Sequence, residues 1–138
     1  MTDRHSILLV EDDLAHAEIT RRNLEEFSEH VRELVHISDG QAALDYLHDS
    51  RLPNLILLDL RLPRVDGLEV LQQVKQDRRL RCIPVVVLTT SRSESDLRGA
   101  YERGANGYLV KPVEFGAFLE LTRTLGAFWL KCNRYAHA

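Results

Sequence analysis

The chain contains little that would support a disulfide framework, a cysteine-based metal site or a membrane anchor. Its 138 residues include only two cysteines, Cys82 and Cys132, which are far apart and form no CxxC pair. Such sparse cysteine usage is typical of proteins from a reducing compartment. No apolar run approaches the roughly 20 residues of a membrane span, and the first residues lack the apolar stretch of a signal peptide. We therefore expect a cytoplasmic protein with no membrane partner.

An excess of positive charge is also missing. The sequence has 18 lysines and arginines against 21 aspartates and glutamates, and its isoelectric point is near 6.1. Domains that bind nucleic acid usually carry a basic face, so we expect no nucleic-acid partner. The length and a hydrophobic content of 44% suit a single core, and we expect one domain over residues 1–138 with no separate output domain.

Short apolar runs alternate with segments of helical periodicity along the chain. The apolar runs predict buried strands at residues 6–10, 55–58, 85–88 and 107–110, and a more polar run at 31–37 predicts an edge strand. A helical segment follows each strand. This alternation predicts an α/β fold with a doubly wound five-stranded parallel sheet in the flavodoxin-like order 2-1-3-4-5 and helices on both faces.

Polar residues, glycine and proline mark the element boundaries. Asp13 and Ser93 stand where helix N-caps belong, and Asp66 precedes a further helix. The first helix carries an apolar face as far as Phe27, and Gly104 suits the left-handed position after a helix end. Each of the four prolines falls between predicted elements, as the lost N–H of proline requires.

Polar side chains follow the predicted buried strands at the point where each strand ends. Glu11 and Asp12 follow the first strand, Asp59 the third, Thr89 the fourth and Lys111 the fifth. In a parallel sheet these positions converge on one crevice. Carboxylates suit Mg²⁺ or Mn²⁺, while an ammonium and a hydroxyl suit phosphoryl oxygens. The sequence therefore predicts a metal-dependent site that accepts a phosphoryl group onto an aspartate.

The histidines are not predicted to take part in this site. The six side chains show no metal-ligand spacing, and we expect them to be solvated or to serve packing. Asp13 is likewise interpreted as a helix cap.

Four sequence blocks resemble the signature blocks of receiver domains of two-component response regulators. The blocks are ILLVEDD at residues 7–13, LILLDLRLPRVDG at 55–67, PVVVLTTS at 84–91 and GYLVKP at 107–112. The intervals between the strand-end groups match that family closely, and the resemblance covers nearly the whole chain. It implies that Asp59 is the phosphoacceptor, that Lys111 binds the phosphoryl group, and that a sensor histidine kinase supplies it.

The same resemblance implies the metal ligands and the switch residues. Asp12 and Asp59 would hold the metal, with Glu11 acting through water and the backbone carbonyl of Arg61 as a further ligand.

Thr89 would be the switch hydroxyl and Tyr108 the switch aromatic residue, and Lys111 would be joined to Pro112 by a cis bond. The protein would catalyse only its own phosphorylation and dephosphorylation, and would signal to an unidentified downstream protein through a changed surface.

A narrower resemblance concerns the partner kinase. The LTTS sequence at 88–91 and the aromatic tail at 128–130 resemble the small response regulators of bacterial phytochromes. Alternative functions are a phosphate sink and an intermediate phosphorelay carrier. A phosphohydrolase of the haloacid-dehalogenase type would need a second aspartate where Arg61 stands. A flavodoxin would need a phosphate loop rich in serine, threonine and glycine, and an adaptor pseudo-receiver would lack one of the essential groups.

The last helix, from about residue 113 past Trp129, carries more apolar surface than one sheet contact needs. Its apolar residues span an arc of roughly 200°, about twice the usual stripe of a surface helix. One interpretation is that the tail folds back over its own domain. The other is a homodimer through this helix, with candidate contacts at Phe115, Leu119, Phe128, Trp129 and Leu130.

Overall fold

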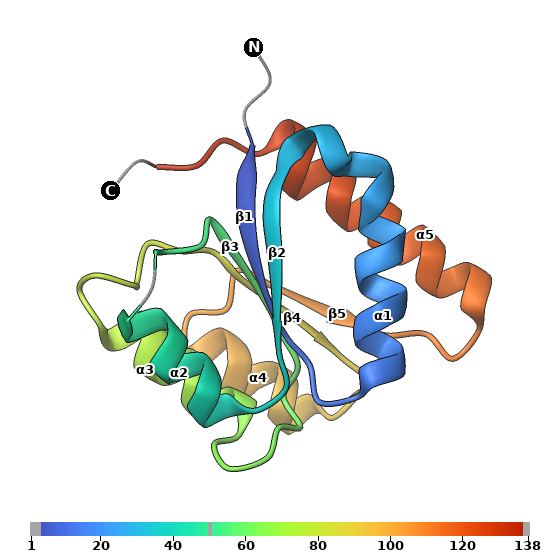
Figure 1. Cartoon of the computed structure of the whole chain (residues 1–138). Coiled ribbons are helices and arrows are strands. Elements are labelled where there is room, and N and C mark those ends of the chain that lie inside the picture. The colour runs from blue at the N-terminus through green and yellow to red at the C-terminus, as the bar shows by residue number, and fades with distance from the viewer. Residues whose placement is uncertain (1–3, 50, 137–138) are drawn as a thin grey trace.

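Five parallel strands form a single sheet in the computed structural model, which describes residues 4–49 and 51–136 (Figure 1). The strands are β1 (His5–Val10), β2 (Val31–Ile37), β3 (Leu55–Leu58), β4 (Val85–Thr89) and β5 (Gly107–Val110). They lie in the order β2-β1-β3-β4-β5, and every neighbouring pair is parallel. The predicted strand order and fold class are confirmed.

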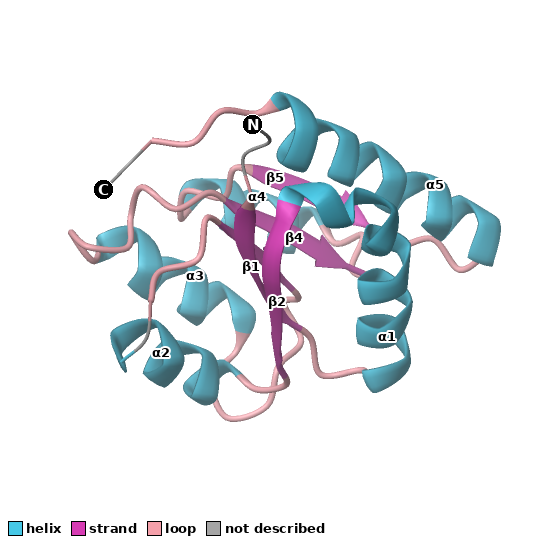
Figure 2. Ribbon diagram, turned by 45° about the horizontal axis from the view of Figure 1, so that its top comes forward, coloured by secondary structure: helices cyan, strands magenta, loops and turns pink. Residues whose placement is uncertain are grey.

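Helices cover both faces of this sheet (Figure 2). They are α1 (Leu14–Asn23), α2 (Gly40–Asp49), α3 (Gly67–Gln76), α4 (Glu94–Glu102) and α5 (Phe115–Gly126). The predicted caps are present: Asp13, Asp66 and Ser93 each accept a hydrogen bond from the first turn of the helix that follows. Gly104 follows the end of α4 with a φ of 98°, a left-handed conformation that glycine adopts without strain.

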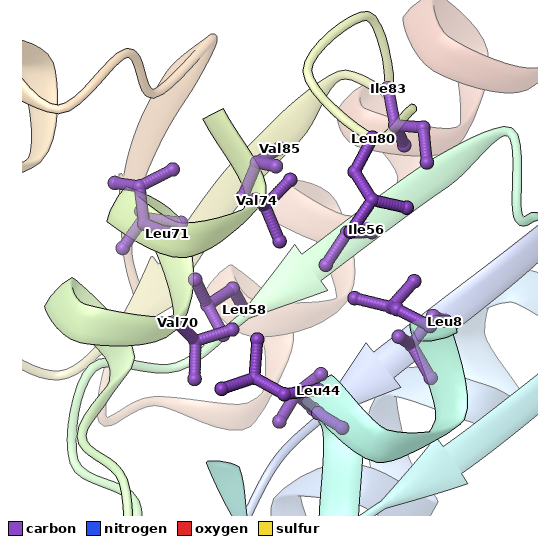
Figure 3. Close-up of a cluster of buried hydrophobic side chains, with 14 of the residues drawn as sticks. Leu8, Leu44, Ile56, Leu58, Val70, Leu71, Val74, Leu80, Ile83 and Val85 are labelled. Carbon is purple, nitrogen blue, oxygen red and sulfur yellow. The ribbon is translucent and has the colours of Figure 1, made fainter. Parts of the chain in front are cut away.

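Two apolar clusters hold these layers together, because alternate residues of each strand point to opposite faces. Leu8 of β1 and Ile56 of β3 pack with α2 and α3 in the first cluster (Figure 3). Ile7 and Leu57, one residue away on the same strands, pack with α1 and α5 in the second. Burial on both faces explains why these strands are continuous apolar runs in the sequence.

The first helix is shorter than its apolar periodicity predicts. A 3₁₀ helix, η1 (Leu24–His30), replaces its last part, and Phe27 has non-helical φ and ψ of −102° and 22°. The ring of Phe27 lies against Gly126 of α5, where any Cβ would collide with it. The change of geometry therefore places this buried ring in the contact between the two helices.

The last helix extends past Trp129, as predicted, but with a change of geometry. After Gly126 it continues as a π-helical segment, η2 (Ala127–Cys132). Leu130 is 2% exposed within the second cluster, and Trp129 packs against the same cluster. The Tyr135 hydroxyl then donates to the Trp129 carbonyl at 2.5 Å. This part of the tail folds back over its own domain, so Leu130 belongs to the core rather than to the predicted dimer contact.

Other residues of the last helix remain on the surface. Phe115 and Phe128 are 62% and 52% exposed, and Leu119 is half-buried. No helix within residues 4–49 and 51–136 is long and apolar enough to cross a membrane. All peptide bonds in that part of the chain are trans, so the predicted cis bond between Lys111 and Pro112 is wrong. Lys111 reaches its partners in the site from a trans peptide bond.

Candidate phosphoryl-acceptor site

The polar residues that end β1, β3, β4 and β5 come together at the carboxyl edge of the sheet. Glu11, Asp59, Thr89 and Lys111 are 2%, 8%, 0% and 3% exposed, whereas most other polar side chains are on the surface. The Lys111 ammonium donates a short hydrogen bond to Glu11 Oε1 and a second, of 3.0 Å, to Asp59 Oδ2. The sequence correctly predicts that these groups converge, since parallel strands place their carboxyl ends at one edge.

Two buried carboxylates share the charge of one ammonium in this cluster. Burial is the main reason that the pKa of Glu11 rises to about 7; its hydrogen bond with Lys111 opposes the rise and the neighbouring Asp59 adds to it. Burial alone would raise the pKa of Asp59, but hydrogen bonding with Glu11 and the charge of Lys111 outweigh burial and lower it. Asp59 is therefore the more readily ionised carboxyl, as a nucleophile requires.

Backbone groups hold the Asp59 carboxylate in its orientation. Its Oδ1 accepts from the Leu60 N–H at 2.7 Å and weakly from the Arg61 N–H at 3.4 Å. Its Oδ2 is the atom that faces Lys111. One carboxylate oxygen is thus anchored to the loop after β3, and the other faces the ammonium.

The other predicted metal ligands lie at the same edge of the sheet but do not form a compact cluster with Asp59. Asp12 is exposed and Glu11 is paired with Lys111. Among the described residues, no three histidine, cysteine, aspartate or glutamate side chains form a ready-made metal cluster. The donor chemistry nevertheless fits Mg²⁺, which usually keeps several waters and needs only one or two protein carboxylates. The negative charge that Lys111 leaves uncompensated favours a cation here.

The two predicted switch residues meet at the loop between β4 and α4. Thr89 Oγ1 accepts from the Ser91 N–H at 3.3 Å, and the Tyr108 hydroxyl donates to the Ser91 carbonyl at 3.1 Å. The Thr89 hydroxyl also helps to lower the pKa of Asp59, after the larger effects of burial, Glu11 and Lys111. Ser91 therefore links the buried hydroxyl to the aromatic side chain of β5, a role that no motif in the sequence indicates.

A further polar contact joins this loop to the phosphoacceptor loop. Asp96 Oδ2 of α4 accepts from both Arg61 Nη2 and Ser91 Oγ, each at 2.5 Å. Hydrogen bonding from Ser91 is the main cause that lowers the pKa of Asp96, with Arg61 adding to it. The side chain of the residue two positions after Asp59 is thus tied to the first turn of α4.

His16 also lies at the site, although no histidine is predicted to take part in it. Its Nδ1 is 3.0 Å from Lys111 Nζ. A histidine in the first turn of the helix after the acidic pair is the only signal that the sequence offers. His36 contacts the same segment, because its Nε2 is 2.8 Å from the Glu11 carbonyl oxygen.

Comparison with known proteins places this geometry in a family. The family model of the response regulator receiver domain matches residues 7–123. The chain belongs to the response regulator receiver domain family. The fold and strand-end residues of this receiver domain thus agree with the resemblance seen in its sequence.

Two relatives of this receiver domain align with it over most of the length of both chains. The probable methanogenesis regulatory protein FilR2 of Methanothrix harundinacea is 49% identical over 96% of this chain and 88% of its own. The response regulator Rcp1 of Synechocystis is 42% identical over 91% and 88% of the two chains.

Solved structures of two response regulators are also similar to this chain over nearly its whole length. The phosphorylated cyanobacterial phytochrome response regulator RcpA superposes with a TM-score of 0.93 at 35% identity, over 97% of this chain and 99% of its own. The Mn²⁺-bound form of Rcp1 superposes with a TM-score of 0.86 at 39% identity, over 96% and 99% of the two chains. The predicted resemblance to phytochrome response regulators is confirmed as a similarity of sequence and fold.

Proposed function

We propose that this receiver domain accepts a phosphoryl group from a sensor histidine kinase onto Asp59, in a reaction that depends on Mg²⁺ or Mn²⁺. The observation that carries the proposal is the arrangement of Asp59 Oδ2 beside the Lys111 ammonium, with Glu11 and Thr89 buried around them. A low-pKa carboxylate next to one fixed cation is suited to attack phosphorus while the cation binds the phosphoryl oxygens.

The chain's own residues perform the transfer as follows. Asp59 Oδ2 forms a bond to phosphorus while phosphorus loses its bond to the donor, which is the imidazole nitrogen of a kinase phosphohistidine or the acetyl oxygen of acetyl phosphate. The donor leaves with the bonding electrons, either as acetate or as a neutral imidazole that already carries a proton on its other ring nitrogen. The Lys111 ammonium exchanges its hydrogen bond to Asp59 Oδ2 for one to a phosphoryl oxygen. The Thr89 hydroxyl donates a hydrogen bond to a second phosphoryl oxygen.

The metal would be held by Asp12 and Asp59, with Glu11 acting through water and the Arg61 carbonyl as a further ligand. When bound, it would offset the repulsion among the acids and neutralise charge on the incoming phosphoryl group. The Mn²⁺-bound structure of Rcp1 supports this assignment by similarity.

The signal would be a change of the surface formed by α4, β5 and α5. Once phosphorylated, Asp59 would draw the Thr89 hydroxyl away from the Ser91 N–H, and Tyr108 would lose its present contact with the Ser91 carbonyl. Such a change is a population shift, because the phosphoryl group favours one of two arrangements of this loop. The receiver would work in the cytoplasm without enzymatic turnover of other substrates, and a downstream protein would read the altered face.

Intact-mass measurement after incubation with acetyl phosphate and Mg²⁺ tests the central proposal. We expect the mass of one phosphoryl group on the wild-type protein, and none in Asp59→Asn or after chelation of the metal. Asp45→Asn, which changes an exposed aspartate of α2, is the matched control and should behave like the wild type. Phosphorylation that persists in Asp59→Asn would refute the assignment.

The kinase that we propose is a bacteriophytochrome. Similarity to Rcp1 and to the phytochrome regulator RcpA supports this partner, whereas the relative FilR2 is named a probable methanogenesis regulatory protein. Phosphotransfer should be profiled against all sensor kinases of the source organism in one experiment. Fastest transfer from a phytochrome-type kinase is the expected result, and fastest transfer from any other kinase would overturn the partner while leaving the receiver function intact.

The last helix leaves a surface that supports the proposed homodimer. Phe115 and Phe128 are more than half exposed, and Leu119 lies half-buried on the same helix, whereas Trp129 packs mainly on its own domain. Exposed aromatic residues of this kind often carry most of the energy of an interface. We therefore propose a symmetric contact through α5 and η2, centred on Phe128.

Sedimentation over a concentration series tests this contact. Phe128→Ala should weaken the dimer by one to a few kcal/mol, on the order expected for an aromatic interface residue. Tyr101→Ala is the matched control, because this α4 side chain is also 52% exposed but lies on another helix. A wild-type protein that stays monomeric at high concentration, with and without phosphorylation, would exclude the dimer.

A further inference from the structure

The ammonium of Lys111 has three acceptors, although the phosphoryl chemistry accounts for only two of them. A lysine ammonium carries three N–H donors. Two are directed to the carboxylates of Glu11 and Asp59, and the third is directed to His16 Nδ1 at 3.0 Å. Because an ammonium can only donate, the imidazole accepts through Nδ1 and carries its own proton on Nε2.

Two different helices hold the imidazole in this position. The His16 N–H donates to Asp13 Oδ1 at 3.0 Å, which places the residue in the first turn of α1. The ring of Phe118 in α5 meets the imidazole edge-on, with 6.0 Å between ring centroids. The His16 side chain is 31% exposed, whereas that of Glu11 is 2% exposed. His16 therefore approaches the ammonium from the solvent side, from which a phosphoryl donor must arrive.

We propose that His16 is a positioning residue for phosphoryl transfer, in which the neutral imidazole holds the Lys111 ammonium at the mouth of the site. This inference rests on the proposed function of Asp59 as phosphoacceptor. Without His16, Glu11 and Asp59 would be the only acceptors for the Lys111 ammonium among the described residues, and they would draw this long, flexible side chain inward. The third acceptor keeps one N–H of the ammonium directed outward, which reduces the rearrangement needed when phosphoryl oxygens enter.

Protonation of His16 would abolish this arrangement. An imidazolium has no acceptor nitrogen and would place a second cation beside the ammonium. Its Nδ1–H would instead face Asp13 Oδ2, which is 3.7 Å away on the same turn. Among the described residues that contact the imidazole, the charged partners are Asp13 and Lys111, with Glu11 and Asp59 bound on the other side of the ammonium, and Phe118 from α5 is uncharged. A protonated His16 would thus release Lys111 from its outer contact.

Two substitutions separate the acceptor from the titration. His16→Asn keeps an acceptor oxygen close to the position of Nδ1 but cannot be protonated, and His16→Leu has similar bulk with no acceptor. The initial rate of phosphorylation by acetyl phosphate with Mg²⁺ should be measured by intact mass from about pH 8 to about pH 5.5, the range in which histidines titrate. The ratio of two rates at each pH removes the titrations that the two proteins share, which are those of the donor, of Asp59 and of Glu11.

At the upper end of this range we expect His16→Asn to match the wild type and His16→Leu to be slower by about 10-fold, as expected for one hydrogen bond to a charged group. The ratio of wild-type to His16→Asn rates should fall as the pH is lowered, which a merely structural role would not produce. Equal rates for all three proteins at the upper end, or a ratio that does not change with pH, would overturn the inference.

A second measurement tests the contact without any phosphorylation. Nitrogen-15 NMR of the imidazole reports which ring nitrogen is protonated, and we expect the Nε2–H tautomer for neutral His16 in the wild type. The Nδ1–H tautomer would overturn the proposed contact even if the rates behaved as expected. If the wild type took up no phosphoryl group at all, the proposed function would fail, and the tautomer would still decide whether His16 accepts from Lys111.

Discussion

Gly67, the first residue of α3, offers a test of how tightly the fold holds the phosphoacceptor. Its N–H donates to the Leu60 carbonyl at 2.9 Å, and its Cα lies against the backbone that follows β3. A Cβ at this position would be 2.5 Å from Leu60 Cα and would also collide with the Asp59 carbonyl oxygen. The perturbation Gly67→Ala therefore presses backbone against backbone directly beside the nucleophile, where no flexible side chain can move aside.

The size of the effect follows from these distances. Carbon atoms in contact are normally about 3.5–4.0 Å apart, so α3 and the Asp59 loop must separate by about 1 Å. Overpacking of this kind costs about 1–3 kcal/mol. Replacing glycine by alanine in a helix recovers up to about 1 kcal/mol. We expect a net destabilisation of about 1–2 kcal/mol, which for a domain of this size lowers the melting temperature by roughly 3–8 °C.

Gly99→Ala in α4 is the matched control. Its Cβ would lie 3.1 Å from Arg103 Nη1, the movable end of a long side chain, and 3.6 Å from a Leu68 methyl group. This variant should be as stable as the wild type or slightly more stable. Urea and thermal unfolding of the three proteins give the comparison, and phosphorylation of Gly67→Ala should also be slowed because Asp59 is displaced. A Gly67→Ala protein as stable as Gly99→Ala would show that the backbone contact imposes no such constraint.

Three further predictions concern charge, switching and pH. Lys111→Met leaves the buried carboxylates of Glu11 and Asp59 without a cation. It should lower the free energy of unfolding measured in urea by about 3 kcal/mol, and this decrease should be smaller when Mg²⁺ is present. Tyr108→Ala should take up phosphate at nearly the wild-type rate but bind its partner kinase or target more weakly in pull-down assays; a block of phosphorylation as severe as in Asp59→Asn would contradict its switch role. Burial raises the pKa of Tyr135 to about 12. Because the unfolded chain releases this proton near pH 10, the stability that Tyr135 contributes is present below about pH 10 and is lost as the pH rises toward 12. Between about pH 9 and about pH 11, the free energy of unfolding in urea should therefore fall more for the wild type than for Tyr135→Phe.

The strands and the main groups of the candidate site could be predicted because each depends on local sequence. A strand buried on both faces has to be a continuous apolar run, and such runs end at Val10, Leu58 and Val110. The residue after each run falls at the carboxyl edge of the sheet whatever the rest of the chain does. Asp59 and Lys111 could therefore be placed together without knowledge of any side-chain contact.

The parts that could not be predicted depend on contacts between distant segments. Phe27 fits a helical pattern, but in the structure it lies in a 3₁₀ helix after α1, where its ring packs against Gly126 of α5. Leu130 fits an exposed apolar stripe until the π-helical turn directs it into the core. His16 has no motif of its own, because its role arises from the distance to a lysine 95 residues away in the chain.

The site also divides into a rigid part and a part that can move. The backbone at the acidic and basic groups is held by the sheet: the Asp59 N–H donates to the Val10 carbonyl at 3.0 Å, and the Lys111 N–H donates to the Thr89 carbonyl at 2.7 Å. Ser91, which both switch residues contact, lies outside any strand, and its contacts with them are single hydrogen bonds of 3.1 and 3.3 Å. Breaking two such bonds costs little compared with displacing a strand, at about 1 kcal/mol each. A phosphoryl group on Asp59 can therefore rearrange this loop while the backbone of Asp59 and of Lys111 stays in place, so reversible chemistry and a reversible surface change can share one edge of the sheet.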